Sequence, residues 1–230
     1  GVIVSADYSQ IELRIMAHLS CDSHLINAFK EGQDVHAITA AKIFGIPLEE
    51  VTADQRRIAK TANFGIMYGI SSFGLSQRLH IGRAEAKKII EDYFANFPAI
   101  SSFIEDTLTA ARETGYVETI FGRRRYLPDI SSRNGTVRAL AERTAVNAPI
   151  QGTSADIIKM AMINVNRRLE KEGLKSRMVL QIHDELVFDA VADEVEVLER
   201  IVREEMENVT QLSVPLTVEC NHGSNWLEAH

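Results

Sequence analysis

Four side chains with complementary chemistry recur at intervals of four residues between Asp54 and Gly69. In a helix, this spacing lines them up on one face: Arg56, Lys60, Phe64 and Tyr68. An arginine and a lysine can hold a triphosphate, and an aromatic ring one or two turns further on can stack against a base. The row therefore predicts a nucleotide-binding helix face, whereas an isolated Arg-x-x-x-Lys pair is typical of a solvated surface helix.

Small or apolar residues occupy the other side of the same stretch: Ile58, Ala62, Gly65 and Ile66. They predict that this side packs against a partner helix.

Two carboxylates follow apolar, strand-like runs. Asp7 ends the run Val2-Ile3-Val4-Ser5-Ala6, and Asp184 stands with His183 and Glu185 between the apolar runs of 178–182 and 186–188. The second pattern predicts a tight hairpin with these polar residues at its turn. Either acid alone is more often a cap or turn residue. Together, on neighbouring strands of one sheet, they predict a magnesium site.

A nucleotide-binding helix and a two-carboxylate magnesium site combine into one chemistry. Two ions about 3.5 to 4 Å apart can activate an attacking hydroxyl and stabilise a leaving pyrophosphate, which is nucleotidyl transfer.

The elements that position these residues are mostly helical. We expect a strand over residues 1–6 and helices over 10–20 and 23–30. A helical block then covers 34–116, with breaks at 45–47, 69–73, 80–82 and 97–98, where glycine or proline interrupts the pattern.

A hairpin over 116–127 follows the helical block and carries Arg123, Arg124 and Arg125. One helix is expected over 135–148, halted by Pro149, and a second over 153–173.

Whole-chain quantities fit a soluble globular protein with a net charge of −7. Residues 1–184 hold 23 basic and 21 acidic side chains, while 185–230 hold 2 and 11, so the acidic excess is local. It falls largely on 193–207, where an apolar helical stripe predicts that the carboxylates form a solvated face. Cys21 and Cys220 have no metal-type spacing, and no apolar run is long enough to cross a membrane.

Three long segments resemble motifs A, B and C of family A DNA polymerases, in the right order. They are Asp7-Tyr-Ser-Gln-Ile-Glu-Leu-Arg14, Arg56-x3-Lys60-x3-Phe64-x3-Tyr68-Gly69 and His183-Asp184-Glu185. The similarity runs from Val2 to His230 and includes Asp34-Val-His36, 122–129 and 147–152.

The resemblance implies an α+β fold, with an antiparallel-sheet palm and a mostly helical fingers insertion. Residues 1–20 and 132–230 would form the palm, and 21–131 the fingers. The implied activity is template-directed DNA synthesis with two Mg²⁺ ions. Its partners would be primer-template DNA and deoxynucleoside triphosphates, and the protein would be a cytoplasmic monomer of the bacterial nucleoid, away from membranes.

The resemblance also implies a role for each matching residue. Asp7 and Asp184 would bind both metals, with the Tyr8 carbonyl as a further ligand, and Lys60 would share in catalysis. The nucleotide would contact Gln10, Glu12, His36, Arg56, Lys60, Phe64 and Tyr68. DNA would contact Arg143, Asn147, Gln151, His183, Arg123 and Arg124, and Glu185 would support the metal site.

The family's polymerase region begins well before motif A, so this chain resembles a truncated piece without a thumb. We expect it to fold but to bind DNA weakly and to be nearly inactive alone. One alternative is a single-subunit RNA polymerase, against which Glu12 argues because a bulky acid there would block a 2′-OH. The other is a non-catalytic nucleic-acid-binding module.

Overall fold

The computed structural model describes all 230 residues of the chain. They divide into two compact units, one formed by residues 1–12 and 154–230 and the other by residues 13–153. Each unit is described by itself below. The combination of helices with an antiparallel sheet confirms the predicted α+β class.

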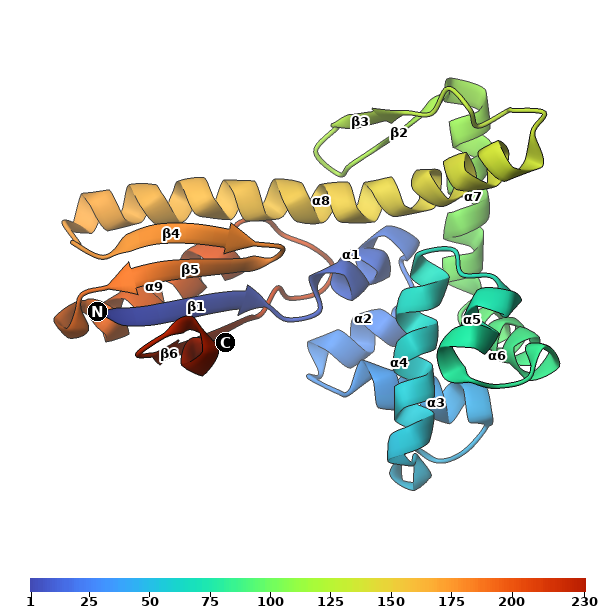
Figure 1. The fold of residues 1–230 in the computed structure, drawn as a ribbon, viewed down its shortest axis with the longest axis horizontal. Helices are drawn as coiled ribbons and strands as arrows, with labels where there is room; N and C mark the ends of the chain where they lie inside the picture. Colours follow the sequence, from blue (N-terminus) through green and yellow to red (C-terminus); the bar gives the residue numbers. More distant parts are fainter. The chain divides into compact units, whose positions relative to one another are not determined.

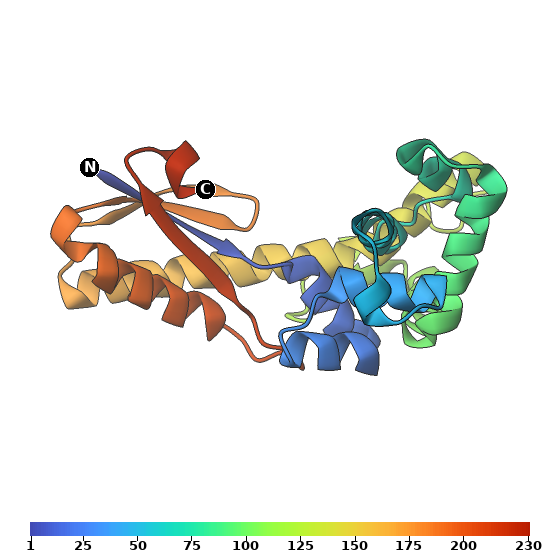
Figure 2. The same cartoon turned by 90° about the horizontal axis from the view of Figure 1, so that it is seen from below.

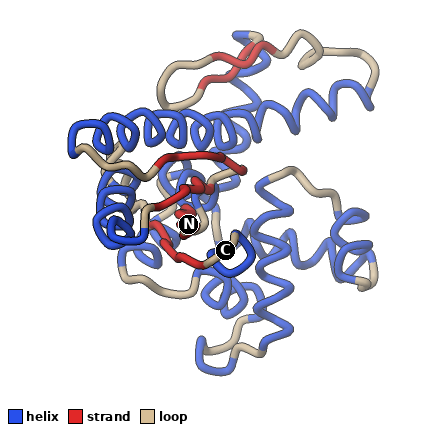
Figure 3. The backbone as a smooth tube through the Cα atoms, turned by 60° about the vertical axis from the view of Figure 1, so that its left-hand side comes forward, coloured by secondary structure: helices blue, strands red, loops and turns tan.

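The first unit is built on a four-stranded antiparallel sheet in the order β4-β5-β1-β6 (Figure 1). The strands are β1 (Val2–Tyr8), β4 (Arg177–Ile182), β5 (Glu185–Ala190) and β6 (Val218–Gly223). Figure 3 shows these four strands side by side. The predicted first strand and the 178–188 hairpin are therefore confirmed, but β1 continues through Asp7 to Tyr8 and pairs with a neighbour on each side.

Alternate residues of β1 serve the two faces of this sheet. Val4, Ala6 and Tyr8 are fully buried, and the Tyr8 hydroxyl donates a hydrogen bond to the Met206 carbonyl at 2.6 Å. Met206 belongs to α9 (Val195–Glu207), so the even-numbered residues of β1 face that helix. The odd-numbered residues, Asp7 among them, belong to the other face.

Helices cover both faces of the sheet. Figure 2 shows α8 (Gly135–Glu172) and α9 along one face and α10 (Trp226–Ala229) at the other. A short 3-10 turn, η2 (Ala192–Glu194), precedes α9. The apolar stripe predicted for 193–207 is confirmed by four fully buried side chains: Leu198, Ile201, Val202 and Met206.

The second unit is mostly helical, as predicted. Its helices are α1 (Ile11–Ser20), α2 (Ser23–Lys30), α3 (Val35–Phe44), α4 (Ala53–Met67), α5 (Ser72–Leu79), α6 (Arg83–Asn96) and α7 (Pro98–Thr114), with the 3-10 turn η1 (Leu48–Glu50). The division between the units falls inside α1 and α8. The breaks between the helices lie where glycine and proline predicted them.

Side-chain caps fix the start of two helices that matter for the site. Asp34 accepts hydrogen bonds from the backbone N–H groups of His36 and Ala37 at the start of α3. Thr52 and Gln55 form a reciprocal capping box at the start of α4. These caps position the first turns of α3 and α4, which pack against each other.

The predicted arginine-bearing hairpin is present as β2 (Tyr116–Glu118) and β3 (Arg124–Tyr126). Its base is anchored by a small apolar cluster that includes Ala111, Val117, Leu127 and Ala145. Because Ala145 lies on α8, the cluster joins the hairpin to that helix.

The prediction of two helices separated by Pro149 is wrong, because α8 runs without interruption from Gly135 to Glu172. A proline inside a helix removes one backbone hydrogen bond. On either side of it, Ala145, Val146 and Ile150 are buried. Burial of this continuous apolar face outweighs the local preference to end the helix at the proline. No helix of the chain combines the length and the hydropathy that crossing a bilayer requires.

Candidate functional site

Three carboxylates lie in one row across the sheet of the first unit. Asp7 on β1 pairs with Glu185 on β5 and with Glu219 on β6. Side chains directly opposite one another in an antiparallel sheet share a face, and like charges there repel. The row is electrostatically unfavourable unless a cation or a proton compensates it.

Asp184 is brought beside this row by the turn between β4 and β5. Ile182 pairs with Glu185, which leaves His183 and Asp184 as a two-residue connection. His183 has the positive φ of 54° that such a tight hairpin requires. The backbone N–H of Tyr8 donates to the Asp184 carbonyl at 3.3 Å, so the turn is tied to the end of β1.

Asp7 has the electrostatic character of a cation ligand. Its Oδ1 is buried and has no hydrogen-bond partner. Burial, together with the charges of Asp184 and Glu185, raises the pKa of Asp7 to about 6. Burial also raises the pKa of Asp184. A divalent cation would relieve both effects, so the two residues fit a hard metal ion that prefers oxygen ligands.

The protein would supply only part of such a coordination sphere. No group of three or more His, Cys, Asp or Glu side chains is placed to hold a metal ion. A magnesium ion commonly keeps several waters and takes one or two carboxylates together with substrate phosphates. The Asp7–Asp184 pair matches this open type of site, and the Tyr8 carbonyl stays a predicted ligand.

Glu185 differs from Asp7 because the protein already satisfies its oxygens. Its Oε1 accepts hydrogen bonds from Ser5 Oγ at 2.6 Å and from Trp226 Nε1 at 2.8 Å. Its Oε2 lies 3.5 Å from Nδ1 of His230. The residue is only 3% exposed. These contacts suit the supporting role predicted for Glu185, and they show that α10 anchors it.

The predicted row of charged and aromatic residues is formed by α4 in the second unit. Arg56 and Lys60 are exposed, Phe64 is half-buried, and Tyr68 caps the end of the helix. The predicted packing side is buried: Ile58, Ala62, Gly65 and Ile66. The helix therefore separates a polar, accessible face from a packed one.

The row on α4 lies against the first turn of α3. Nε of Arg56 forms an ion pair with Oδ2 of Asp34 at 2.6 Å, while Oδ1 of Asp34 caps α3. The rings of His36 and Phe64 lie 5.8 Å apart. Arg56, His36 and Phe64 thus form one cluster, in which the carboxylate of Asp34 aligns the guanidinium.

Three predicted DNA-binding residues, Arg143, Asn147 and Gln151, follow one another at intervals of four on α8 and share one face. Oδ1 of Asn147 is buried and has no hydrogen-bond partner. At Gly69, which has a φ of 70°, an added Cβ would lie 3.0 Å from Cγ of Arg143. The close approach at Gly69 places Arg143 beside the end of α4.

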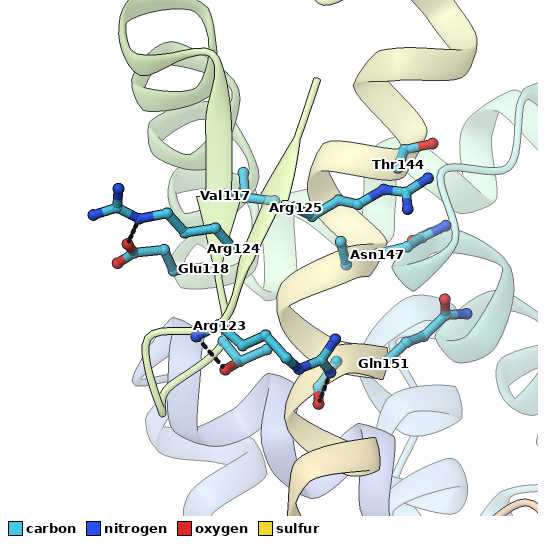
Figure 4. Close-up of a pocket in the computed structure, with 11 residues that line it drawn as sticks. Val117, Glu118, Arg123, Arg124, Arg125, Thr144, Asn147 and Gln151 are labelled. Carbon is cyan, nitrogen blue, oxygen red and sulfur yellow. Dashed lines mark hydrogen bonds and ion pairs between the residues drawn. The ribbon is translucent and has the colours of Figure 1, made fainter. Parts of the chain in front are cut away.

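The hairpin arginines and α8 line a cavity of about 420 Å³ (Figure 4). Arg123 reaches from the hairpin to α8 and donates to the Gly152 carbonyl at 3.0 Å. Arg124 forms an ion pair with Glu118 and stacks over Tyr116. The third arginine of the run, Arg125, lies on the same side as Asn147 in Figure 4.

The predictions of DNA binding named Arg123 and Arg124 but not Arg125, which lines the same cavity. The sequence offered one clue to it, because in a strand alternate residues point to the same side and Arg125 lies two positions from Arg123.

Two further residues predicted to contact the nucleotide lie at the start of α1. Gln10 is exposed and has a positive φ of 51°, and Glu12 is half-buried in the first turn of α1. Within the first unit, Asp7, Tyr8, Asp184 and Glu185 come together. The second unit brings together His36, Arg56 and Phe64, and separately Asn147, Gln151 and the hairpin arginines.

The chain is similar to known proteins in both sequence and structure. The sequence matches DNA polymerase family A over residues 1–228, and the chain belongs to that family. It is 52% identical to DNA polymerase I of Streptococcus pneumoniae over all of its length, which is 26% of that protein. It is 53% identical to DNA polymerase I of Pseudomonas aeruginosa over 99% of the chain, which is 25% of that protein.

A solved structure is also similar. It is described as the POL domain of Pol1 from M. smegmatis in complex with DNA primer-template and dNTP. The TM-score is 0.95 with 48% identity, and the match covers 100% of this chain and 40% of the other. The chain thus spans about a quarter of the length of the curated relatives it matches.

Proposed function

We propose that this chain supplies the catalytic carboxylates and the nucleotide-binding helix of an enzyme for template-directed DNA synthesis. The reaction joins a deoxynucleoside triphosphate to the 3′-OH of a primer and releases pyrophosphate. The observation that carries the proposal is the buried, partnerless Oδ1 of Asp7 in a row of carboxylates beside Asp184.

Asp7, Asp184 and the carbonyl of Tyr8 would hold two Mg²⁺ ions. When bound, such a pair of ions lowers the pKa of the attacking hydroxyl and stabilises the charge on the leaving pyrophosphate. Oε1 of Glu185 accepts hydrogen bonds from Ser5 and Trp226, and Glu185 acts as a supporting residue.

The residues of α4 and α3 bind and orient the incoming nucleotide. Arg56 offers a planar fork of donors to the triphosphate, and Lys60 a movable charge that follows the phosphates as negative charge grows on them. His36 adds a donor at the same cluster. Phe64 packs against the sugar and base, and Tyr68 guards the template position.

Residues of the first motif complete the nucleotide contacts. Gln10 contacts the nucleotide, and Glu12 occupies the space that a 2′-OH would need, which selects deoxynucleotides. The family result supports this reading over the RNA polymerase alternative.

Nucleic-acid contacts divide into two kinds. Arg143, Asn147 and Gln151 test the minor groove, which presents acceptors common to all correctly formed base pairs. His183 is a separate DNA contact. The hairpin arginines, Arg123 and Arg124, bind backbone phosphates, which position the duplex without reading its sequence.

The partners in this proposal are primer-template DNA and deoxynucleoside triphosphates, which the described complex of the M. smegmatis relative supports. Residues 1–20 and 132–230 act as palm and 21–131 as fingers, in a monomer of the bacterial cytoplasm.

Primer extension tests the proposal. A full-length protein carrying this sequence is incubated with a labelled primer on four templates that differ in the first unpaired base, with Mg²⁺ and one nucleotide at a time. We expect extension only by the complementary deoxynucleotide, and none with EDTA. Incorporation that ignores the template, or equal use of ribonucleotides, would refute the proposal.

A further inference from the structure

A buried network of hydrogen bonds joins α3 and α4 behind the cluster of Arg56, His36 and Phe64. Its members are Thr39, Asn63 and His36, all of which are at most 2% exposed. Asn63 lies on the packed side of α4, next in sequence to Phe64. The network therefore links the buried side of α4 to its nucleotide-binding side.

The protons in this hydrogen-bond network can be assigned from the donors and acceptors that its side chains carry. Oγ1 of Thr39 carries one proton, and it lies 2.8 Å from the Val35 carbonyl, which can only accept. Oγ1 of Thr39 also accepts a hydrogen bond from Nδ2 of Asn63 at 3.1 Å and lies 3.2 Å from Oδ1 of the same amide, so Thr39 contacts both polar atoms of Asn63. The second N–H of the same amide faces Nδ1 of His36 at 3.0 Å.

His36 is consequently an acceptor at Nδ1. Burial, together with the charges of Arg56 and Lys60, lowers the pKa of His36 to about 4, although Asp34 opposes this effect. The ring is therefore neutral at pH 7. A neutral imidazole carries one proton, and with Nδ1 accepting, that proton is on Nε2. No other side chain of the protein engages Nε2 in a hydrogen bond.

We propose that Asn63, held by Thr39, is a positioning residue that fixes His36 as the Nε2–H tautomer, so that His36 is a neutral hydrogen-bond donor to the triphosphate. This inference rests on the proposed function of the cluster as a triphosphate site. It assigns a role to two buried polar residues that touch neither nucleotide nor metal.

The tautomer matters because a phosphate oxygen can only accept. The Nε2–H form presents a donor to it, whereas the Nδ1–H form would present a lone pair and repel it. A neutral donor also avoids placing a third cation beside Arg56 and Lys60 in the free enzyme. Neutral imidazole is an established way to donate a hydrogen bond to an anionic group.

Nitrogen-15 NMR of the histidine rings tests the assignment without any nucleotide. The 230-residue chain has seven histidines, and a His36→Gln sample identifies the resonances of His36. At pH 7.5 we expect Nε2 of His36 to resonate as a protonated nitrogen and Nδ1 as an unprotonated one. A protonated Nδ1 in the wild-type chain would overturn the inference.

Three substitutions test the cause. Thr39→Ser keeps the hydroxyl and should leave the His36 spectrum unchanged. Thr39→Val has the same shape but frees the amide of Asn63 to rotate, and both tautomers should appear. Asn63→Asp replaces the donor by an acceptor and should move a proton to Nδ1. An unchanged His36 spectrum in both Thr39→Val and Asn63→Asp would overturn the inference.

Titration of the same samples with dTTP and Mg²⁺ links the tautomer to function. We expect dTTP affinity to fall at least about threefold in Thr39→Val, to fall about tenfold or more in Asn63→Asp, and to stay within twofold in Thr39→Ser. The fall in Asn63→Asp should largely disappear in a His36→Ala background. A changed tautomer with unchanged affinity would overturn the positioning role. Failure of the wild-type chain to bind dTTP would instead refute the nucleotide site itself, whatever tautomer NMR reports.

Discussion

The carboxyl group of Asp7 is expected to make the metal-free protein less stable at neutral pH, and Asp7→Asn is expected to remove that cost. Asp7 is partly buried between Glu185 and Glu219, and its Oδ1 has no partner. The amide of asparagine keeps the shape of the side chain but carries no charge. The substitution should therefore stabilise the fold while it destroys the metal site.

The sign and size follow from the pKa. Burial and the neighbouring acids raise the pKa of Asp7 from 3.8 to about 6, so the native state binds a proton more tightly than the unfolded state. The free energy of unfolding consequently falls as the pH rises from 3.8 to about 6, and the loss is complete above that range. A shift of this size corresponds to at most about 3 kcal/mol. Because Asp7 is partly exposed, we expect about 1 to 2 kcal/mol.

Urea denaturation in EDTA at pH 7.5 and at pH 3.5 provides the assay. Trp226 is the only tryptophan and reports on this unit through its hydrogen bond to Glu185. Asp7→Asn should raise the free energy of unfolding at pH 7.5 and change it little at pH 3.5. Asp189→Asn, an exposed carboxylate of the same sheet, serves as the control and should be neutral at both. In excess Mg²⁺ the order should reverse, because only the wild type is stabilised by the ion. If Asp7→Asn destabilises the chain at pH 7.5 without metal, the electrostatic reasoning is wrong.

Four more substitutions test single contacts in a full-length protein carrying this sequence. Lys60→Ala should mainly lower kcat, because the contact of Lys60 with the leaving phosphates strengthens as charge grows on them, whereas Arg56→Ala should mainly raise KM. Steady-state kinetics measure both constants. If both substitutions change KM alone and by equal amounts, the proposed difference between the two cations is wrong. Trp226→Phe removes one hydrogen-bond donor to Glu185 and should raise the Mg²⁺ concentration for half-maximal activity about tenfold. An unchanged Mg²⁺ concentration would show that this hydrogen bond does not support the metal site. Phe64→Tyr adds a hydroxyl beside the sugar and should reduce discrimination against dideoxynucleotides by roughly ten- to hundredfold, measured as the ratio of kcat/KM for deoxynucleotides to that for dideoxynucleotides. An unchanged ratio would show that Phe64 does not lie beside the sugar.

Local sequence patterns were sufficient to predict most elements of this fold. The helix breaks between residues 34 and 116 coincide with glycine or proline, whose backbone restrictions act within a few residues. The 178–188 hairpin was predictable because two apolar runs flank a short polar turn. Pro149 was misleading, since the packing that keeps α8 continuous comes from residues far away in the sequence.

The acids and bases of the candidate site were predictable from their type and spacing, but the residues that hold them were not. Trp226 and Ser5 meet on Glu185 although 221 positions separate them in the chain, and only the sheet brings them together. Asn63 and Thr39 look like ordinary helix residues in the sequence. Their role depends on the packing of α3 against α4, which no local sequence pattern predicts.

Single-turnover primer extension by Asp7→Asn and Asp184→Asn in the full-length protein tests the central claim most directly. Glu219→Gln, which removes the third acid of the row, is the matched control. We predict that each aspartate variant still binds primer-template but loses more than about 90% of the rate, while Glu219→Gln retains most of it. An aspartate variant that keeps more than about a tenth of the wild-type rate has lost under about 1.4 kcal/mol of transition-state stabilisation. That result would contradict the assignment of this carboxylate as a catalytic metal ligand.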